Sequence, residues 1–347
     1  METITLDKVA EFIKIFRSIF WEAMPFVVLG AVIAGVLEEL LPQRLLTRVL
    51  PRSRTLAIAL GALLGLVFPM CECGIIPVMR RLLRKGLPLS CCVAYILAGP
   101  IINPVVLLST FAAFSGMEGA LDPRGGLSYQ MGGPWMVGLR AGLGFLVAFV
   151  TAHLVDRLYR RHGNKLLTPL AMPPAEPTAE EEAEVDGPRR TLWQRLSNIS
   201  ETALHDFVDI AVFLLLGALL SSFMHMVLSK ALIAQLSQNH AVLSILLMMG
   251  LAVVLCLCSE ADAFVAASFV TLRPAAKLSF LVLGPMLDLK LYLMYTRVFR
   301  PRLIWTIFLS VILQTFVYCY AVHVLWEHYA PQFMTPPAVV KPAGPSQ

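Results

Sequence analysis

Residues 88–116 read PLSCCVAYILAGPIINPVVLLSTFAAFSG, and none of them is charged. A helix needs about 20 apolar residues to cross the ~30 Å hydrocarbon core of a bilayer, so this segment is long enough to enter a membrane. Gly99-Pro100 and Pro104 interrupt it. Proline removes a backbone N–H and disrupts the preceding helical turn. The sequence therefore predicts a membrane helix that is broken in its middle.

The rest of the chain has the same apolar character. Of its 347 residues, 57% are hydrophobic and 15% are charged, whereas soluble domains average about 45–50% and about 25%. This composition excludes a soluble globular or disordered protein. The formal charge of +5 comes from basic residues scattered between apolar segments, so we expect no nucleic-acid partner. We predict an all-α polytopic membrane protein with 8–10 hydrophobic segments. The other apolar segments are 20–41, 55–71, 134–157, 207–229, 241–258, 275–298 and 303–327.

The first residues form a separate feature. Residues 1–20 mix charged residues with apolar residues at helical spacing, which is typical of a helix that lies in the membrane interface. We expect this interfacial helix to lead into the first span.

The chain consists of two related halves. A shift of 185 positions, the distance from Cys71 to Cys256, superimposes several motifs of the first half on the second, as an internal duplication would. The matches are Cys71 with Cys256, Cys73 with Cys258, Gly99-Pro100 with Gly284-Pro285, and Asn103 with Asp288. A segment rich in Pro and Glu separates the halves and cannot bury enough apolar surface to order itself. We predict a first membrane repeat at 1–165, a flexible cytoplasmic linker at 166–196 and a second membrane repeat at 197–347.

The distribution of Lys and Arg predicts the topology. These residues concentrate in four stretches, which the positive-inside rule assigns to the cytoplasm: residues 42–54, 80–87, 157–206 and 297–302. Basic residues therefore flank 55–79 on one side, and we expect this segment to enter the membrane and return as a hairpin with its tip at 71–74. Residues 241–272 should do the same from the opposite side, with their tip at 256–262. About three full spans plus one hairpin per half make the repeats inverted.

Inverted repeats with broken helices are the architecture of secondary transporters, whose substrate site lies near the midplane. We therefore assign helix-break and coupling roles to Gly99, Pro100, Asn103, Pro104, Gly284, Pro285, Asp288 and Lys290. Asp288 and Lys290 are expected to pair across the break or to belong to an ion path, because ionisable groups inside a membrane are costly. Arg140 is expected to be either an anchor that snorkels to the interface or a further intramembrane charge.

The two Cys-x-Cys pairs carry the clearest chemical signal. Thiolates prefer Cu(I), Zn(II) and other soft ions, and trivalent arsenic or antimony fits for the same reason. Carboxylates accompany both pairs. The predicted residues for binding a metal or metalloid substrate are Cys71, Cys73, Cys256, Cys258, Glu72, Glu260 and Asp262. We expect no catalytic residues and no cofactor.

Four blocks of the chain carry a family resemblance: CECGIIP at 71–77, LAGPIINP at 97–104, CSEADAF at 258–264 and GPMLDLK at 284–290. In these blocks the sequence resembles the YraQ-like bacterial permease family (UPF0718), which includes the organoarsenical efflux permease ArsP. The resemblance implies a multi-pass permease of the bacterial cytoplasmic membrane. In the arsenical branch the first block reads Cys-Ser-Cys-Gly, with its cysteines implicated in binding trivalent arsenic. Glu72 in the middle position here adds a hard, charged ligand and leaves room for a divalent cation.

Three functions follow from these observations. The leading hypothesis is a secondary-active permease that exports a thiophilic metal or metalloid ion, since the sequence has no P-loop for ATP. One alternative is a membrane thiol–disulfide oxidoreductase that uses the cysteine pairs. Another is a permease subunit that works only with a partner protein. The expected partners are the lipid bilayer, the transported ion, and either further copies of the chain or an accessory membrane or periplasmic subunit.

Overall fold

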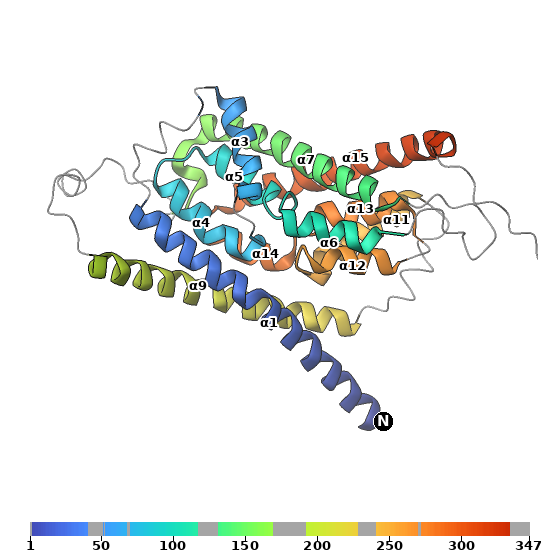
Figure 1. Ribbon diagram of the computed structural model, residues 1–347, viewed down its shortest axis with the longest axis horizontal. Coiled ribbons are helices and arrows are strands. Elements are labelled where there is room, and N and C mark those ends of the chain that lie inside the picture. The colour runs from blue at the N-terminus through green and yellow to red at the C-terminus, as the bar shows by residue number, and fades with distance from the viewer. Residues whose placement is uncertain are drawn as a thin grey trace, which may run out of the picture.

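The computed structural model describes residues 2–40, 51, 53–67, 70–116, 131–168, 192–227, 241–269 and 272–333, which are almost entirely helical. Figure 1 shows the helices, which are α1 (Glu2–Leu40), α3 (Arg54–Val67), α4 (Glu72–Arg84), α5 (Leu89–Ala98), α6 (Pro104–Phe114), α7 (Gly133–His162), the short 3-10 helix η1 (Gly163–Leu166), α9 (Leu192–Val227), α11 (Ala241–Leu255), α12 (Ala261–Ser268), α13 (Pro274–Leu283), α14 (Leu289–Tyr295) and α15 (Pro301–Phe333). The all-α prediction is confirmed.

The second half repeats the helix order of the first. The bounds of α13 coincide with those of α5 after the shift of 185 positions, and both helices end at a Gly-Pro pair. A short helix, α6 or α14, follows each break. In packing, α3 lies on α5 as α11 lies on α13, and α5 lies on α7 as α13 lies on α15. Both predicted breaks are therefore present, and the inverted orientation of the two halves stays a prediction.

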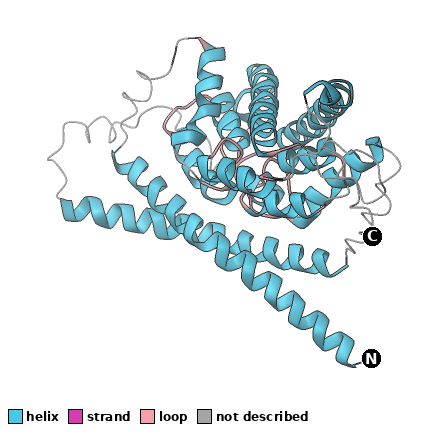
Figure 2. Cartoon of the chain, turned by 45° about the vertical axis from the view of Figure 1, so that its right-hand side comes forward, coloured by secondary structure: helices cyan, strands magenta, loops and turns pink. Residues whose placement is uncertain are grey.

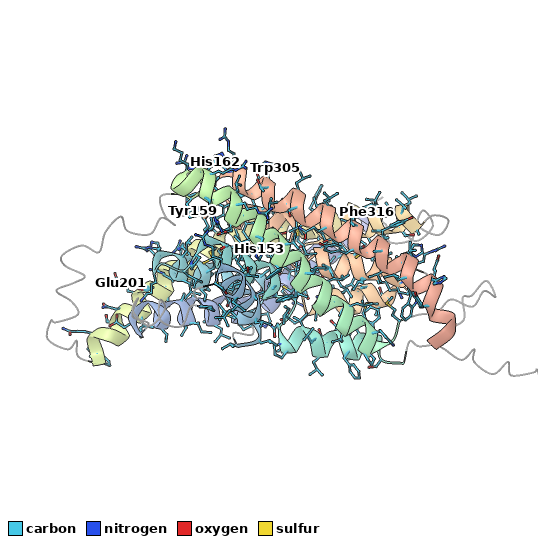
Figure 3. The ribbon with its side chains drawn as sticks, turned by 90° about the horizontal axis from the view of Figure 1, so that it is seen from above. His153, Tyr159, His162, Glu201, Trp305 and Phe316 are labelled. Carbon is cyan, nitrogen blue, oxygen red and sulfur yellow. The ribbon has the colours of Figure 1, made fainter. Side chains whose placement is uncertain are left out.

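Two of the described helices, α7 and α15, are long and apolar enough to cross a membrane. They pack against each other over the body of the molecule (Figure 3). Large apolar side chains are exposed on these helices and on others, among them Leu108, Leu154, Leu246 and Leu309. Such exposure is typical of helices whose outer faces contact lipid.

The helix α1 pairs with α9 along one side of the molecule, and its N-terminal end extends away from the rest (Figures 1 and 2). Within the described residues, the predicted N-terminal helix continues into the following apolar segment without a break, and its place in the membrane interface stays a prediction. The reason for the unbroken helix is local. Glu, Lys and Arg are good helix formers, and no Gly or Pro stands before Pro25 to end the helix.

Glycines let the backbones of neighbouring helices approach closely around the first tip. A Cβ on Gly30 of α1 would lie 2.6 Å from the Gly74 carbonyl oxygen of α4. A Cβ on Gly65 of α3 would lie 2.5 Å from the Cα of Gly99. Small residues at such contacts are a common device of membrane helices. They fix α4 and the first break against the surrounding helices.

Most of the predicted linker, residues 166–196, lies outside the described residues, but its two ends are described. Leu166 and Leu167 are buried. The Leu166 carbonyl accepts a hydrogen bond from the N–H of Arg300 at 3.0 Å, which ties the end of the first half to the start of α15. At the other end, α9 begins at Leu192.

Candidate functional site

The first tip is the start of α4. Cys71 is the N-cap of this helix and Glu72 is its first residue. The side chains of Cys71, Glu72 and Cys73 are all buried, and the two thiols lie within hydrogen-bonding contact of each other. The predicted Cys-Glu-Cys unit therefore places two thiols and a carboxyl group together inside an apolar helix bundle.

Lys290 of the second half reaches this tip. Its Nζ donates a hydrogen bond to Glu72 Oε1 at 2.9 Å, and both side chains are 1% exposed. The expected pairing with Asp288 is present but longer, at 3.8 Å from Nζ to Oδ2. The reason is that the other oxygen of Asp288 caps α14 by accepting the Leu291 N–H. The principal partner of Lys290 thus comes from the opposite half of the chain.

The second tip, residues 256–262, comprises the non-helical connection from Cys256 to Glu260, between α11 and α12, and the start of α12. Cys256 has φ +49° and is the one non-glycine residue with positive φ among the residues that the structure describes. A left-handed backbone of this kind is strained and persists only where its surroundings hold it. The Cys256 thiol faces the backbone N–H groups of Leu289 and Lys290. Cys258 lies within electrostatic reach of both Lys290 and Cys71, so Lys290 lies near both tips.

The helix breaks lie against the tips. Asn103 is the N-cap of α6, and its Oδ1 accepts the Val105 N–H at 2.9 Å. A Cβ on Gly284 at the second break would come within 2.9 Å of Asp262 Oδ2 on the second tip. Across the halves, α4 contacts α14 and α12 contacts α6. The structure therefore brings the predicted tips and breaks into one buried region.

Several polar atoms in this region are buried without a hydrogen bond within the described part of the chain. They are Glu72 Oε2, Asn103 Nδ2, Asp262 Oδ2 and Asp288 Oδ2. Leaving such an atom unpaired costs roughly 1–3 kcal/mol. Native proteins rarely leave these atoms unpaired unless water, an ion or a substrate completes them. Four such unpaired polar atoms in one region are what we would expect of a region that binds a polar or charged species.

Arg140 is a component of the site that our sequence analysis left undecided. Its side chain is fully buried on α7, so the interpretation as a snorkelling anchor is wrong. The guanidinium finds polar partners inside the protein. Nη1 donates to Thr110 Oγ1 at 2.6 Å and Nη2 donates to the Ser259 carbonyl at 3.0 Å.

Lys277 also lies inside the bundle. It is buried on α13 with its Nζ 5.9 Å from the centre of the Phe114 ring. In the sequence, Arg140 and Lys277 each stand within a predicted apolar segment, and this position was the available signal that they are buried.

All seven cysteines are free and buried. Among the described residues, no three His, Cys, Asp or Glu side chains are arranged as a metal-coordinating group. Shared coordination by the two Cys-x-Cys pairs therefore stays a prediction.

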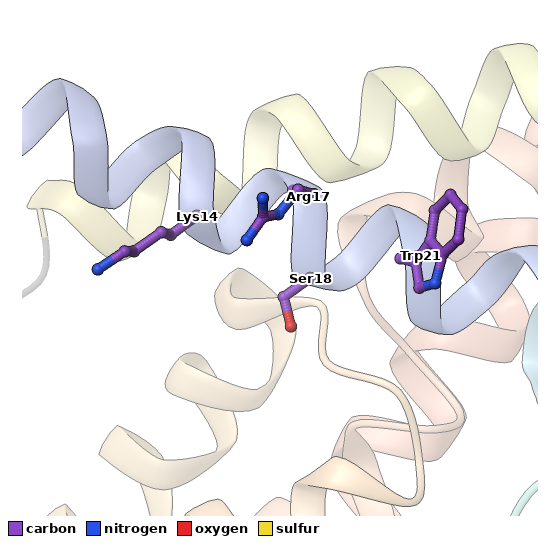
Figure 4. A pocket seen from close by; sticks show the side chains of 4 residues that line it. All are labelled: Lys14, Arg17, Ser18 and Trp21. Carbon is purple, nitrogen blue, oxygen red and sulfur yellow. The ribbon is translucent and has the colours of Figure 1, made fainter.

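A hollow on the outside of the molecule has a different character. It has a volume of about 630 Å³ and is lined by Lys14, Arg17, Ser18 and Trp21 of α1 (Figure 4). None of the predicted site residues lines it.

Long apolar helices, two helices broken at matching positions and a buried set of charges define a class of protein. Irregular backbone and charges at membrane depth are tolerated where they are buried in protein or line a polar path. The fold and site are those of a polytopic membrane transport protein.

Comparison with known proteins places the chain within this class. Residues 8–324 match the family model ArsP_1, described as a predicted permease, and the chain belongs to this family. It is 36% identical over 294 residues to the UPF0718 protein YcgR of Bacillus subtilis (strain 168), covering 84% of this chain and 90% of that protein. It is 30% identical over 321 residues to a putative two-component membrane permease complex subunit of Streptococcus mutans serotype c (strain ATCC 700610 / UA159), covering 92% and 97% respectively.

A third relative is the UPF0718 protein YraQ of Escherichia coli (strain K12), at 29% identity over 98 residues, which is 28% of each chain. No solved structure matches the chain. The family resemblance seen in the sequence blocks is confirmed, and the protein is a membrane permease.

Proposed function

We propose that this chain is a secondary-active permease that exports a thiophilic metal or metalloid ion, either a trivalent arsenical or a soft divalent cation. It acts as a multi-pass protein of the bacterial cytoplasmic membrane. Membership of a permease family supports transport over the alternative of a thiol–disulfide oxidoreductase.

The ion pair between Glu72 and Lys290 is the observation that carries the proposal. It joins the first Cys-x-Cys tip to the second helix break at 2.9 Å in a fully buried position. The thiols of Cys71, Cys73 and Cys258 lie in the same electrostatic environment. Soft sulfur ligands with charged groups beside them, at a point where broken helices meet, suit a thiophilic ion that passes between two halves.

Growth of a metal-sensitised bacterium that expresses this chain tests the proposal. The panel is arsenite, methylarsenite, antimonite, zinc, cadmium and copper. The variant Cys71→Ser/Cys73→Ser removes the thiols of the first tip. The matched control is Cys91→Ser/Cys92→Ser, which alters a second pair of buried thiols on α5. Immunodetection in the membrane fraction establishes that all three proteins are present in equal amounts.

We expect protection against at least one ion, lost in the first-tip variant and kept in the control. Sensitisation by the wild-type chain would contradict efflux and indicate uptake. No difference across the whole panel would contradict a permease that acts alone on these ions.

A second candidate function is that of one subunit of a permease complex. It is favoured by the name of the Streptococcus mutans relative, which is described as a complex subunit. Transport by the purified chain in liposomes tests this candidate. Activity without any other protein would contradict it. Activity that appears only after addition of the product of a neighbouring gene would support it.

A further inference from the structure

Each Cys-x-Cys tip is contacted by a buried cation from the opposite half of the chain. Lys290 of the second half donates to Glu72 on the first tip at 2.9 Å. Arg140 of the first half donates to the Ser259 carbonyl on the second tip at 3.0 Å. Both cations are buried and both contacts join the halves. The site therefore contains two reciprocal contacts, of which only the first involves residues we had predicted for the site.

Arg140 is fixed from its own half before it reaches the second tip. Its Nη1 donates to Thr110 Oγ1 at 2.6 Å, and that hydroxyl in turn donates to the Val106 carbonyl at 2.7 Å. The guanidinium of Arg140, which projects from α7, is thus held in a defined orientation against α6. Its planar fork of donors can serve two acceptors at once, which the single ammonium of a lysine does less well.

The contacted tip is the part of the site that most needs support. Cys256 has a left-handed backbone, which is unfavourable for a residue with a Cβ. The Ser259 hydroxyl has no hydrogen bond among the described residues, so the Ser259 carbonyl is the atom through which this residue is held. Asp262, in the first turn of α12, is the main electrostatic partner of Arg140. Arg140 therefore contacts the loop that carries Cys258 at Ser259 and is attracted electrostatically to Asp262 just beyond that loop.

We propose that Arg140 is a positioning residue that holds the Cys256–Asp262 tip, and with it the Cys258 thiol, in the geometry that binds substrate. The substrate-binding role of the tip rests on the proposed function, but the test of Arg140 does not. Loss of the guanidinium frees the Ser259 carbonyl and lets the second tip move, while Glu72 and Lys290 still hold the first tip.

Alkylation of cysteines in isolated membranes tests the inference without any substrate. A Cys256→Ser background leaves Cys258 as the sole thiol of the second tip. N-ethylmaleimide adducts on Cys258 and Cys73 are measured over time by mass spectrometry of their peptides. In Arg140→Gln we expect Cys258 to react about tenfold faster, which corresponds to the loss of one hydrogen bond from a charged donor, while the rate at Cys73 stays unchanged. The matched control is Arg157→Gln, which alters an exposed arginine on the same helix and should change neither rate.

An equal increase at both cysteines would overturn the inference, because Arg140 would then stabilise the bundle as a whole. Unchanged rates at both cysteines would overturn it as well. If Arg140→Gln does not reach the membrane, Arg140→Lys takes its place. This variant keeps the charge but not the two-acceptor fork, and we expect a selective increase at Cys258 of about threefold, short of the tenfold expected on losing the whole contact.

The labelling result is independent of the growth assay. Selective labelling of Cys258 combined with no resistance to any ion would leave the positioning role intact and contradict the proposed function. Resistance to an ion combined with non-selective labelling would support the proposed function and contradict the positioning role of Arg140.

Discussion

Removing one charge of the pair between Glu72 and Lys290 should destabilise the protein strongly, and removing both should cost clearly less than the two single losses added together. Across 2.9 Å, at an effective dielectric constant of about 20, the attraction is about 6 kcal/mol. Desolvation offsets much of this, and breaking a buried pair by removing one partner typically costs about 3–5 kcal/mol. Lys290→Met removes the cation that pairs with both Glu72 and Asp288, whereas Glu72→Gln leaves Lys290 with Asp288 at 3.8 Å.

We therefore expect the free energy of unfolding to fall by about 3 kcal/mol in Glu72→Gln and by about 5 kcal/mol in Lys290→Met. The double variant should lose at least 3 kcal/mol less than the two losses added together, since replacing both members of a buried pair is often nearly neutral. Titration with sodium dodecyl sulfate in mixed micelles, followed by tryptophan fluorescence, measures these values.

The matched control is Glu327→Gln, which breaks the exposed pair between Arg273 and Glu327, with side chains 43% and 59% exposed. It should cost less than about 1 kcal/mol. Additive losses in the double variant, or a milder effect of Lys290→Met than of Glu72→Gln, would refute the reasoning.

Three further predictions concern stability, measured by the same titration for Asn103 and Cys256 and by the yield of folded protein for Gly65. Asn103→Ala removes the side-chain cap of α6 and should cost about 1 kcal/mol, and no loss would show that this break needs no cap. Gly65→Ala places a Cβ 2.5 Å from the backbone of Gly99 and should reduce the yield of folded protein, whereas Gly138→Ala, with nothing within 4 Å, should be neutral or slightly stabilising. Cys256→Gly should be about 1–2 kcal/mol more stable than Cys256→Ala, because glycine accepts φ +49° without strain, and equal stabilities would count against strain at the second tip.

The fold was largely predictable because its signals are local. Apolar length marks each helix, and the Gly-Pro pairs mark both breaks, which the structure places where the sequence analysis expected them. The helices α1 and α9 begin well before the apolar segments predicted at 20–41 and 207–229, because charged residues end an apolar segment but do not end a helix.

The sequence predicted which segments gather in the buried region, but it did not predict which of their side chains pair. The repeat identified both tips and both breaks from residue identity alone. The partner of Lys290 could not be found this way, because Glu72 lies 218 positions away in the sequence. Arg140 was left undecided for the same reason. Whether a charge inside an apolar span points to the interface or to a partner depends on the packing of other helices.

The reciprocal contacts between the halves also constrain how the protein is made. At roughly 5–20 residues per second, the 218 positions between Glu72 and Lys290 correspond to roughly 10–40 s of synthesis. During this interval the first half is emerging or inserted while its carboxylate lacks the cation that will neutralise it. Arg140 likewise lacks its hydrogen-bond acceptor until Ser259, 119 positions later, has been synthesised. The first half is therefore synthesised before the residues that pair with its buried charges, and both contacts can form only once the second tip and α14 have been made.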